Sequence, residues 1–307
     1  MAKPKFIEFP GKIRVPILWE DPAIIAVDKP PGWMLAPNDW VNTRRNFQLA
    51  LESSMENRDH WAQSRNLKFI RYIHRLDADT SGVLLLARSP GALKVFSKLF
   101  EERKVEKRYL CVVRGVPDHD EWVCSSPLET VKETPVFVRV SDEGKDAKTY
   151  FRVLERGHHN SLLEACPVTG RTHQIRVHLA EQGLPIVGDP LYGQSQKERQ
   201  RTAKDVVLGL RATKIEFLDP YRKKTVWIKT NNEKWLSSFG FGKKPENTRE
   251  AGEKDESKEE TQKKSRPRRD ADRKKKEPGD TPRSHSTKTT RDRLGESTKE
   301  PKKKKGK

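Results

Sequence analysis

The residues best suited to chemistry lie in the stretch His74-Arg75-Leu76-Asp77-Ala78-Asp79-Thr80-Ser81-Gly82. An apolar run at residues 83–87 follows it and predicts a buried strand. Asp77 is therefore expected on a loop that a rigid element holds in place. A carboxylate held in this way can serve as a nucleophile, a general base or a metal ligand. The ordinary alternative is that Asp77 caps a turn, where aspartate is common.

Two further segments carry cationic or aromatic side chains. Lys107-Arg108-Tyr109 starts a run with strand-like alternation, in which Tyr109 is either a functional aromatic or a core residue. The other segment is Thr169-Gly170-Arg171-Thr172-His173-Gln174-Ile175-Arg176-Val177-His178, followed by Gly188-Asp189-Pro190-Leu191-Tyr192-Gly193. Arg171 falls in the first turn of a predicted helix, where an arginine opposes the helix dipole, so a paired role is favoured.

Neither a metal site nor a membrane span is expected. His173 and His178 are five residues apart, which does not put them on one helical face. The three cysteines lack the spacing of zinc ligands, and their odd number argues against a disulfide scaffold. No run of about 18 apolar residues occurs, and the N-terminus lacks the apolar core of a secretory signal. The expected location is the cytoplasm.

The net charge indicates a polyanionic partner. The 307 residues include 63 Lys and Arg against 44 Asp and Glu, which gives a formal charge of +19. Such an excess favours binding to phosphate backbones or to anionic membrane surfaces. A positioned aspartate in a basic protein favours nucleic acid, and the plain alternative is that the charge only aids solubility.

Composition divides the chain into two parts. Residues 243–307 contain no aromatic residue and hold 24 basic against 14 acidic residues, so they carry +10 of the +19. Such a segment cannot bury enough apolar surface to offset the entropy of ordering, and a disordered basic tail is expected. Residues 1–242 retain +9 and suffice for one domain with a core. The tail either adds phosphate affinity or only solubilises the chain.

Strand-like runs outnumber helical ones in residues 1–242. Strands are expected at residues 17–19, 24–27, 83–87, 108–116, 149–154, 162–165, 215–217 and 226–228. Helices are expected at residues 47–55, 93–100 and 171–182. Hairpins join most of the strands, which predicts the α+β class with a mostly antiparallel mixed sheet flanked by helices.

Taken together, these segments resemble the RluA-type family of RNA pseudouridine synthases over about residues 17–228. The string from His74 to Gly82 and the string from Gly170 to His178 are each highly specific to that family. Val27-Asp28-Lys29-Pro30-Pro31-Gly32 also resembles the sequence near the start of that family's catalytic domain. The resemblance implies the pseudouridine synthase catalytic fold for residues 1–242. It further implies isomerisation of a uridine in structured RNA, ribosomal or transfer RNA, with no cofactor.

The resemblance also implies a role for each of three residues. Asp77 is the catalytic carboxylate and attacks either uracil C6 or ribose C1′ of a flipped-out nucleotide. Tyr109 stacks on the target base. Arg171 forms an ion pair with Asp77, which would orient the carboxylate and support its negative charge. The residues expected to contact RNA are His74, Arg75, Thr80, Lys107, His173, Gln174 and Arg176.

Two other classes of function remain open. One is an RNA-binding chaperone that kept the fold, against which the intact Asp77, Tyr109 and Arg171 argue. The other is a nucleotide-directed hydrolase, which would need a second carboxylate, and Asp79 is the nearby candidate. We expect a monomer. We also expect no separate N-terminal RNA-binding domain, because the resemblance begins within about the first 20 residues.

Overall fold

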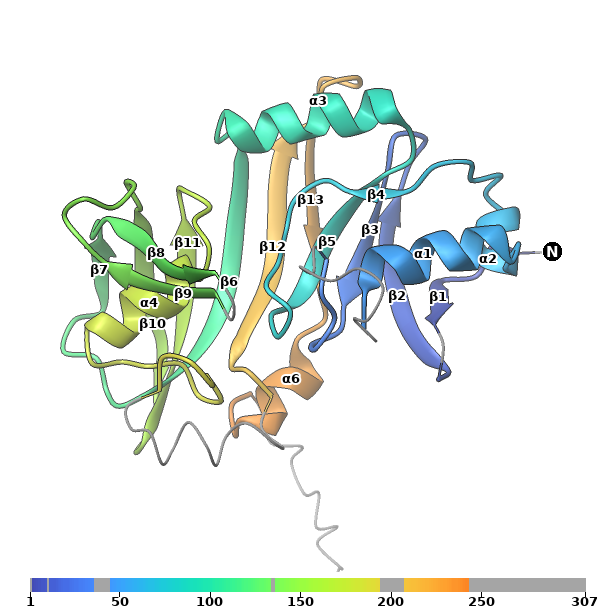
Figure 1. Cartoon of the computed structure of the whole chain (residues 1–307). Coiled ribbons are helices and arrows are strands. Elements are labelled where there is room, and N and C mark those ends of the chain that lie inside the picture. The colour runs from blue at the N-terminus through green and yellow to red at the C-terminus, as the bar shows by residue number, and fades with distance from the viewer. Residues whose placement is uncertain (1, 10, 36–44, 134–135, 194–206, 243–307) are drawn as a thin grey trace, which may run out of the picture. The chain divides into compact units, whose positions relative to one another are not determined.

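The computed structural model describes residues 2–9, 11–35, 45–133, 136–193 and 207–242 (Figure 1). The tail predicted at residues 243–307 lies outside the described residues. The strands are β1 (Phe6–Phe9), β2 (Ile13–Glu20), β3 (Ile24–Lys29), β4 (Arg71–Tyr72), β5 (Ser81–Ala87), β6 (Val105–Arg114), β7 (Glu121–Cys124), β8 (Leu128–Glu133), β9 (Val136–Val140), β10 (Thr149–Arg156), β11 (Asn160–Pro167), β12 (Leu210–Leu218) and β13 (Thr225–Lys229). The helices are α1 (Phe47–Glu56), α2 (His60–Gln63), α3 (Pro90–Glu101), α4 (Gln174–Glu181) and α6 (Glu233–Ser238).

One large sheet organises the described residues. It has 11 strands in the order β1-β2-β3-β5-β12-β6-β11-β10-β7, with β4 beside β5 and β13 beside β12. Among the described strands, β5 and β12 run parallel and the other neighbours antiparallel. β8 and β9 form a separate two-stranded sheet. The predicted α+β class with a mostly antiparallel mixed sheet is therefore confirmed.

β5 is buried along its whole length, which explains its uninterrupted apolar sequence. Because successive side chains of a strand point to opposite faces, it contributes to two cores. Leu84 and Leu86 pack in one core with Phe47 of α1, while Leu85 packs in the other with Phe96 of α3. The two helices thus cover opposite faces of β5, and α3 crosses the strands at the top of Figure 1.

β12 lies between β5 and β6 and thus joins the strands β1-β2-β3-β5 on one side to the strands β6-β11-β10-β7 on the other. Gly82 in β5 has a φ of +117°, and a Cβ there would overlap the carbonyl group of Ala212. Glycine thus permits the close approach of the two strands. Next to it, Arg211 donates hydrogen bonds to Ser81 Oγ at 3.1 Å and to Asp28 Oδ2 at 2.6 Å. These contacts fix the strand that follows the Asp77 loop.

The structure confirms the predicted strands and helices and shifts two boundaries that bear on the site. β6 begins at Val105, so Tyr109 lies in the middle of the strand. α4 begins at Gln174 instead of residue 171, because His173 has a left-handed backbone conformation with a φ of 55° that a helix cannot include. Arg171 therefore lies on a loop. None of the helices in the described part combines the length and the apolar character that a membrane crossing requires.

Candidate active site

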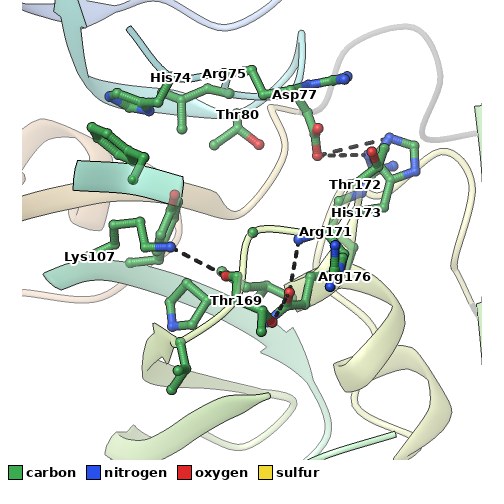
Figure 2. A pocket seen from close by; sticks show the side chains of 18 of the residues that line it. His74, Arg75, Asp77, Thr80, Lys107, Thr169, Arg171, Thr172, His173 and Arg176 are labelled. Atoms are coloured by element: carbon green, nitrogen blue, oxygen red, sulfur yellow. Dashed lines mark hydrogen bonds and ion pairs between the residues drawn. The ribbon is translucent and has the colours of Figure 1, made fainter. Parts of the chain in front are cut away.

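A cleft of about 570 Å³ opens beside the loop that carries Asp77 (Figure 2). Its walls come from residues 72–77, the end of α3, β6 and residues 167–176. All ten residues that the sequence predicts for the site line this cleft. Its volume is in the range that binds a small molecule or a single nucleotide.

Lys29 supports the backbone of the loop that carries Asp77. Its side chain is fully buried, and its Nζ donates hydrogen bonds to the carbonyl oxygens of Ala78 (2.8 Å), Thr80 (3.0 Å) and Pro30 (3.0 Å). Burial lowers the pKa of Lys29 to about 7, against the charges of Asp79 and Asp77, which raise it. A buried ammonium group needs such partners, so the lysine and the loop fix each other.

The carboxylate of Asp77 points into the cleft and faces two side chains across it. Its Oδ2 lies 3.6 Å from Nη1 of Arg176 and 3.9 Å from Nε2 of His173. Within the part of the chain that the structure describes, both contacts involve Oδ2, and Oδ1 has no protein partner. The side chain is 19% exposed, so a ligand in the cleft can reach the free oxygen.

The ion pair expected between Arg171 and Asp77 is made by Arg176 instead. Arg171 is exposed, and its Nε donates a hydrogen bond to the carbonyl oxygen of Asp146 at 3.0 Å. The late start of α4 explains the difference, because it leaves Arg171 on the loop before the helix, whereas Arg176 lies on the helix as predicted.

Arg176 is held in place by Asp189. Its Nε and Nη2 donate hydrogen bonds to the two oxygens of Asp189 at 2.7 and 2.9 Å, a bidentate pair in the protein interior. Burial opposes both charges, yet each partner outweighs it: the pKa of Arg176 is raised and that of Asp189 is lowered. The guanidinium is therefore a fixed positive charge whose remaining Nη1 faces Asp77.

Tyr109 lies half-buried on β6 in the wall of the cleft. Burial, with the charge of Asp77 as a second cause, raises the pKa of its hydroxyl above the ordinary range. The phenol thus stays protonated at neutral pH and presents an aromatic ring to the cleft. A ring in this position can stack on a planar base.

Lys107 lies on the side of the cleft away from Asp77 (Figure 2). Lys107 donates a hydrogen bond to the carbonyl oxygen of Thr169 at 3.3 Å, and burial together with the charge of Arg103 lowers its pKa to about 8. His74 beside it stacks on Phe100 at 4.5 Å. Burial and the charge of Lys107 lower the pKa of His74 to about 3, so this ring is neutral.

The sequence predicts an RNA contact for Gln174, but its side chain forms hydrogen bonds within the protein. Its Oε1 accepts hydrogen bonds from Thr169 Oγ1 (2.6 Å) and from the backbone of Arg171 (3.0 Å). Its Nε2 donates to the carbonyl oxygen of Lys148 (3.0 Å) and to Thr149 Oγ1 (2.9 Å). The amide is buried and all four of its hydrogen-bonding positions are occupied, so it shapes the cleft from behind.

Thr80 and Arg75 line the cleft and differ in their exposure. The hydroxyl of Thr80 is buried in the cleft wall and has no hydrogen-bond partner among the described residues. An unpaired buried hydroxyl is costly unless something binds to it. Arg75 lies exposed at the cleft, where its guanidinium can reach a phosphate group.

Comparison with known proteins identifies the family. Residues 23–181 match the family described as RNA pseudouridylate synthase. The chain belongs to this family. The ribosomal large subunit pseudouridine synthase C of Pasteurella multocida is 34% identical over 221 residues, which cover 71% of this chain and 64% of that protein. An uncharacterized RNA pseudouridine synthase of Zymomonas mobilis is 37% identical over 188 residues, or 59% of this chain and 80% of that protein.

Two solved structures of human pseudouridylate synthase domain proteins have a fold similar to that of this chain. Human RNA pseudouridylate synthase domain containing 1 has a TM-score of 0.56 and 25% identity, covering 71% of this chain and 83% of that chain. Human RNA pseudouridylate synthase domain containing 4 has a TM-score of 0.54 at 23% identity, which supports the fold alone. The chain spans less than two thirds of the length of the Pasteurella protein.

Four residues of this synthase-family site were missed as site residues in the sequence. Lys29, Asp189 and Tyr192 all lie in the motifs at residues 27–32 and 188–193, yet nothing in the spacing of those motifs assigns them a role. Arg103 lines the cleft from the end of α3, where it has a left-handed φ of 57°. In the described ranges no cluster of three or more His, Cys, Asp or Glu could hold a metal ion.

Proposed function

We propose that this chain isomerises uridine in RNA to pseudouridine and that Asp77 is the acting carboxylate. One observation carries the proposal. Within the described residues, one oxygen of Asp77 faces the fixed charge of Arg176, while the other is free in a cleft the size of a nucleotide. Such an arrangement orients a carboxylate for attack on a bound group.

The isomerisation can proceed with the side chains that this cleft contains. The bond between N1 and C1′ breaks, the base turns, and a bond between C5 and C1′ forms while C5 loses its hydrogen as a proton and N1 gains a proton. There is no net oxidation or reduction. The free oxygen of Asp77 adds to either uracil C6 or ribose C1′, and this bond breaks again before the product leaves, while Arg176 holds the other oxygen throughout.

A nucleotide must leave the RNA stack to reach this site. Flipping costs on the order of a few kcal/mol, and stacking on the ring of Tyr109 returns about 1–3 kcal/mol. Arg75 and Lys107 offer cationic contacts to the backbone around the flipped nucleotide. The neutral ring of His74 serves as part of the wall.

We further propose that the target is ribosomal RNA. Several similar bacterial proteins are named ribosomal large subunit pseudouridine synthases, among them one of Escherichia coli that is 35% identical over 209 residues. We assign catalysis to residues 1–242 and added phosphate affinity to residues 243–307, whose charge is +10. The corresponding location is the cytoplasm, where ribosomal RNA is processed in bacteria.

The test is a map of pseudouridines in total RNA from cells with the wild-type protein, with no protein and with Asp77→Ala. Carbodiimide adducts, which stop reverse transcriptase, mark each pseudouridine. The expected result is a stop in ribosomal RNA that is lost in the null strain and in Asp77→Ala. Asp79→Ala is the matched control, because it removes the neighbouring carboxylate and should retain the stop.

Three outcomes would contradict the proposal. An identical map in all strains would favour the RNA-binding alternative. Loss of the stop in Asp79→Ala together with its retention in Asp77→Ala would mean that Asp79, and not Asp77, is the catalytic carboxylate. An Asp77→Asn variant that restored growth of a null strain would show a role that does not need the carboxylate.

A further inference from the structure

The segment from Gly188 to Gly193 holds both groups that face Asp77. Asp189 binds Arg176, as described above, and its Oδ1 also accepts hydrogen bonds from the backbone of Leu191 and Tyr192 at 2.9 and 3.0 Å. The hydroxyl of Tyr192 lies 2.8 Å from Nδ1 of His173. The same short turn therefore controls the cationic and the neutral neighbour of the carboxylate.

We propose that Tyr192 is a positioning residue whose hydroxyl fixes the tautomer of His173, so that the Nε2–H of His173 faces Asp77. The proposal rests on the function proposed above, because it matters only if Asp77 is the acting carboxylate. Tyr192 itself acts through His173 and need not touch the substrate.

The hydrogen bonds around the Tyr192 hydroxyl determine its direction. The backbone N–H of Val138 in β9 donates to this oxygen at 2.9 Å, and a backbone N–H can only donate. Burial raises the pKa of Tyr192 to about 12, so the phenol keeps its proton. Val138 engages one lone pair of the oxygen, and among the described residues the acceptor within reach of the hydroxyl proton is Nδ1 of His173.

His173 is a neutral ring, so only one of its nitrogens carries a proton. Burial lowers the pKa of His173 to about 4, although the charge of Asp77 opposes the shift. If Nδ1 accepts from Tyr192, the proton is on Nε2, which lies 3.9 Å from Oδ2 of Asp77. The other tautomer would aim a lone pair at the carboxylate, which is electrostatically unfavourable. Catalytic hydrogen bonds are often this long before substrate binds.

The surroundings hold both rings in this geometry. The ring of Tyr192 lies between Phe137, stacked at 5.3 Å, and the guanidinium of Arg176 at 5.1 Å. His173 has a left-handed φ of 55°, a conformation that is uncommon for a residue other than glycine and is found where a site requires it. Two donors thus converge on Oδ2 of Asp77 and leave Oδ1 to the substrate.

The tautomer can be observed without RNA. The protein is labelled with nitrogen-15 in histidine, and the signals of His173 are assigned by their loss in His173→Gln. We expect a protonated Nε2 in the wild type and a population of the Nδ1-protonated form in Tyr192→Phe. Tyr221→Phe, which removes the hydroxyl of an exposed tyrosine, should leave the spectrum unchanged. A protonated Nδ1 in the wild type, or an unchanged spectrum in Tyr192→Phe, would refute the assignment.

The effect on catalysis is measured with a transcript of large-subunit ribosomal RNA that carries tritium at C5 of uridine, because the reaction releases this hydrogen. At saturating RNA, Tyr192→Phe should release tritium about tenfold more slowly, with unchanged half-saturating concentration. His173→Gln should retain more activity than His173→Asn, because the glutamine amide can occupy the place of Nε2.

A double-mutant cycle separates action through His173 from a merely structural effect. If Tyr192 acts through the ring, Tyr192→Phe should cause no further loss in the His173→Gln background. Independent losses that multiply, or a loss of RNA affinity at unchanged rate, would contradict the positioning role. If the wild type releases no tritium from this transcript, the result contradicts the proposed function on this RNA. The nitrogen-15 spectra still determine the tautomer of His173 in that case.

Discussion

Replacing Lys29 by methionine should change how the stability of the fold depends on pH. Lys29 is fully buried and binds three carbonyl oxygens of the loop region, and burial lowers its pKa from 10.5 to about 7. Between these two values the unfolded chain keeps a proton that the folded chain has released. Because the unfolded state then binds more protons, this group makes the folded state more stable as pH rises.

The size of the effect follows from the shift. Each pH unit within the window contributes up to about 1.4 kcal/mol. From about pH 7 to about pH 9.5, the free energy of unfolding of the wild type should thus rise by about 3 kcal/mol relative to Lys29→Met. The comparison cancels the other titrating groups, since both proteins contain them. Over the same range the loop loses support, because a neutral amine has two N–H groups for three carbonyls.

Urea denaturation of both proteins at several pH values measures this difference. Curves of unfolding free energy against pH should diverge, with the wild type rising relative to Lys29→Met. Parallel curves would refute the argument, because they would mean that Lys29 titrates alike in the folded and unfolded states. A wild-type curve that falls relative to the variant would show that the ammonium group is stabilised by its partners more than burial destabilises it.

Three further predictions concern the cleft. Arg176→Gln should slow tritium release by about 100-fold or more, because it unpairs both Asp77 and buried Asp189, whereas Arg171→Gln should slow it by less than about tenfold. Thr80→Val should leave the free energy of unfolding unchanged or raise it by up to about 1 kcal/mol, because the buried hydroxyl has no protein partner, yet it should slow the reaction about tenfold. RNA affinity, measured by fluorescence anisotropy, should fall as pH rises through about 8, because Lys107 then loses its charge; Lys107→Arg should remove this dependence.

Each of these predictions has a result that contradicts it. A greater loss in Arg171→Gln than in Arg176→Gln would restore the pairing expected from the sequence. A clear loss of stability in Thr80→Val would mean that its hydroxyl serves the fold. An unchanged pH dependence in Lys107→Arg would assign the titration to another group. Unfolding midpoints of Arg176→Gln show whether the variant is folded before its rate is interpreted.

The sequence predicts the site well where a motif is continuous in the chain. The loop from His74 to Gly82 and the strand that carries Tyr109 both lie where the local pattern places them, since each depends on apolar runs of neighbouring residues. The short strands β7, β8 and β9 were missed, because four to six residues give little periodicity.

The choice between Arg171 and Arg176 lay outside what the sequence could decide. Both arginines stand in one motif, and the start of α4 determines which of them faces Asp77. That start depends on the left-handed backbone of His173. Glycine is the residue that usually marks such a conformation in a sequence, and this position holds a histidine instead. The contacts of Lys29 span 49 and 51 residues and depend on the whole sheet.

The position of β12 has a consequence for the synthesis of the protein. This strand enters the sheet between β5 and β6, although more than 90 residues separate it from either of them in the chain. Until the ribosome has released residues 210–218, β5 and β6 each have an edge without its final neighbour. Gly82 then has no Ala212 against it, and the loop of Asp77 has only part of its support. The candidate active site is thus among the last parts of the molecule to assemble, and a nascent chain that stops before β12 exposes two strand edges that favour aggregation.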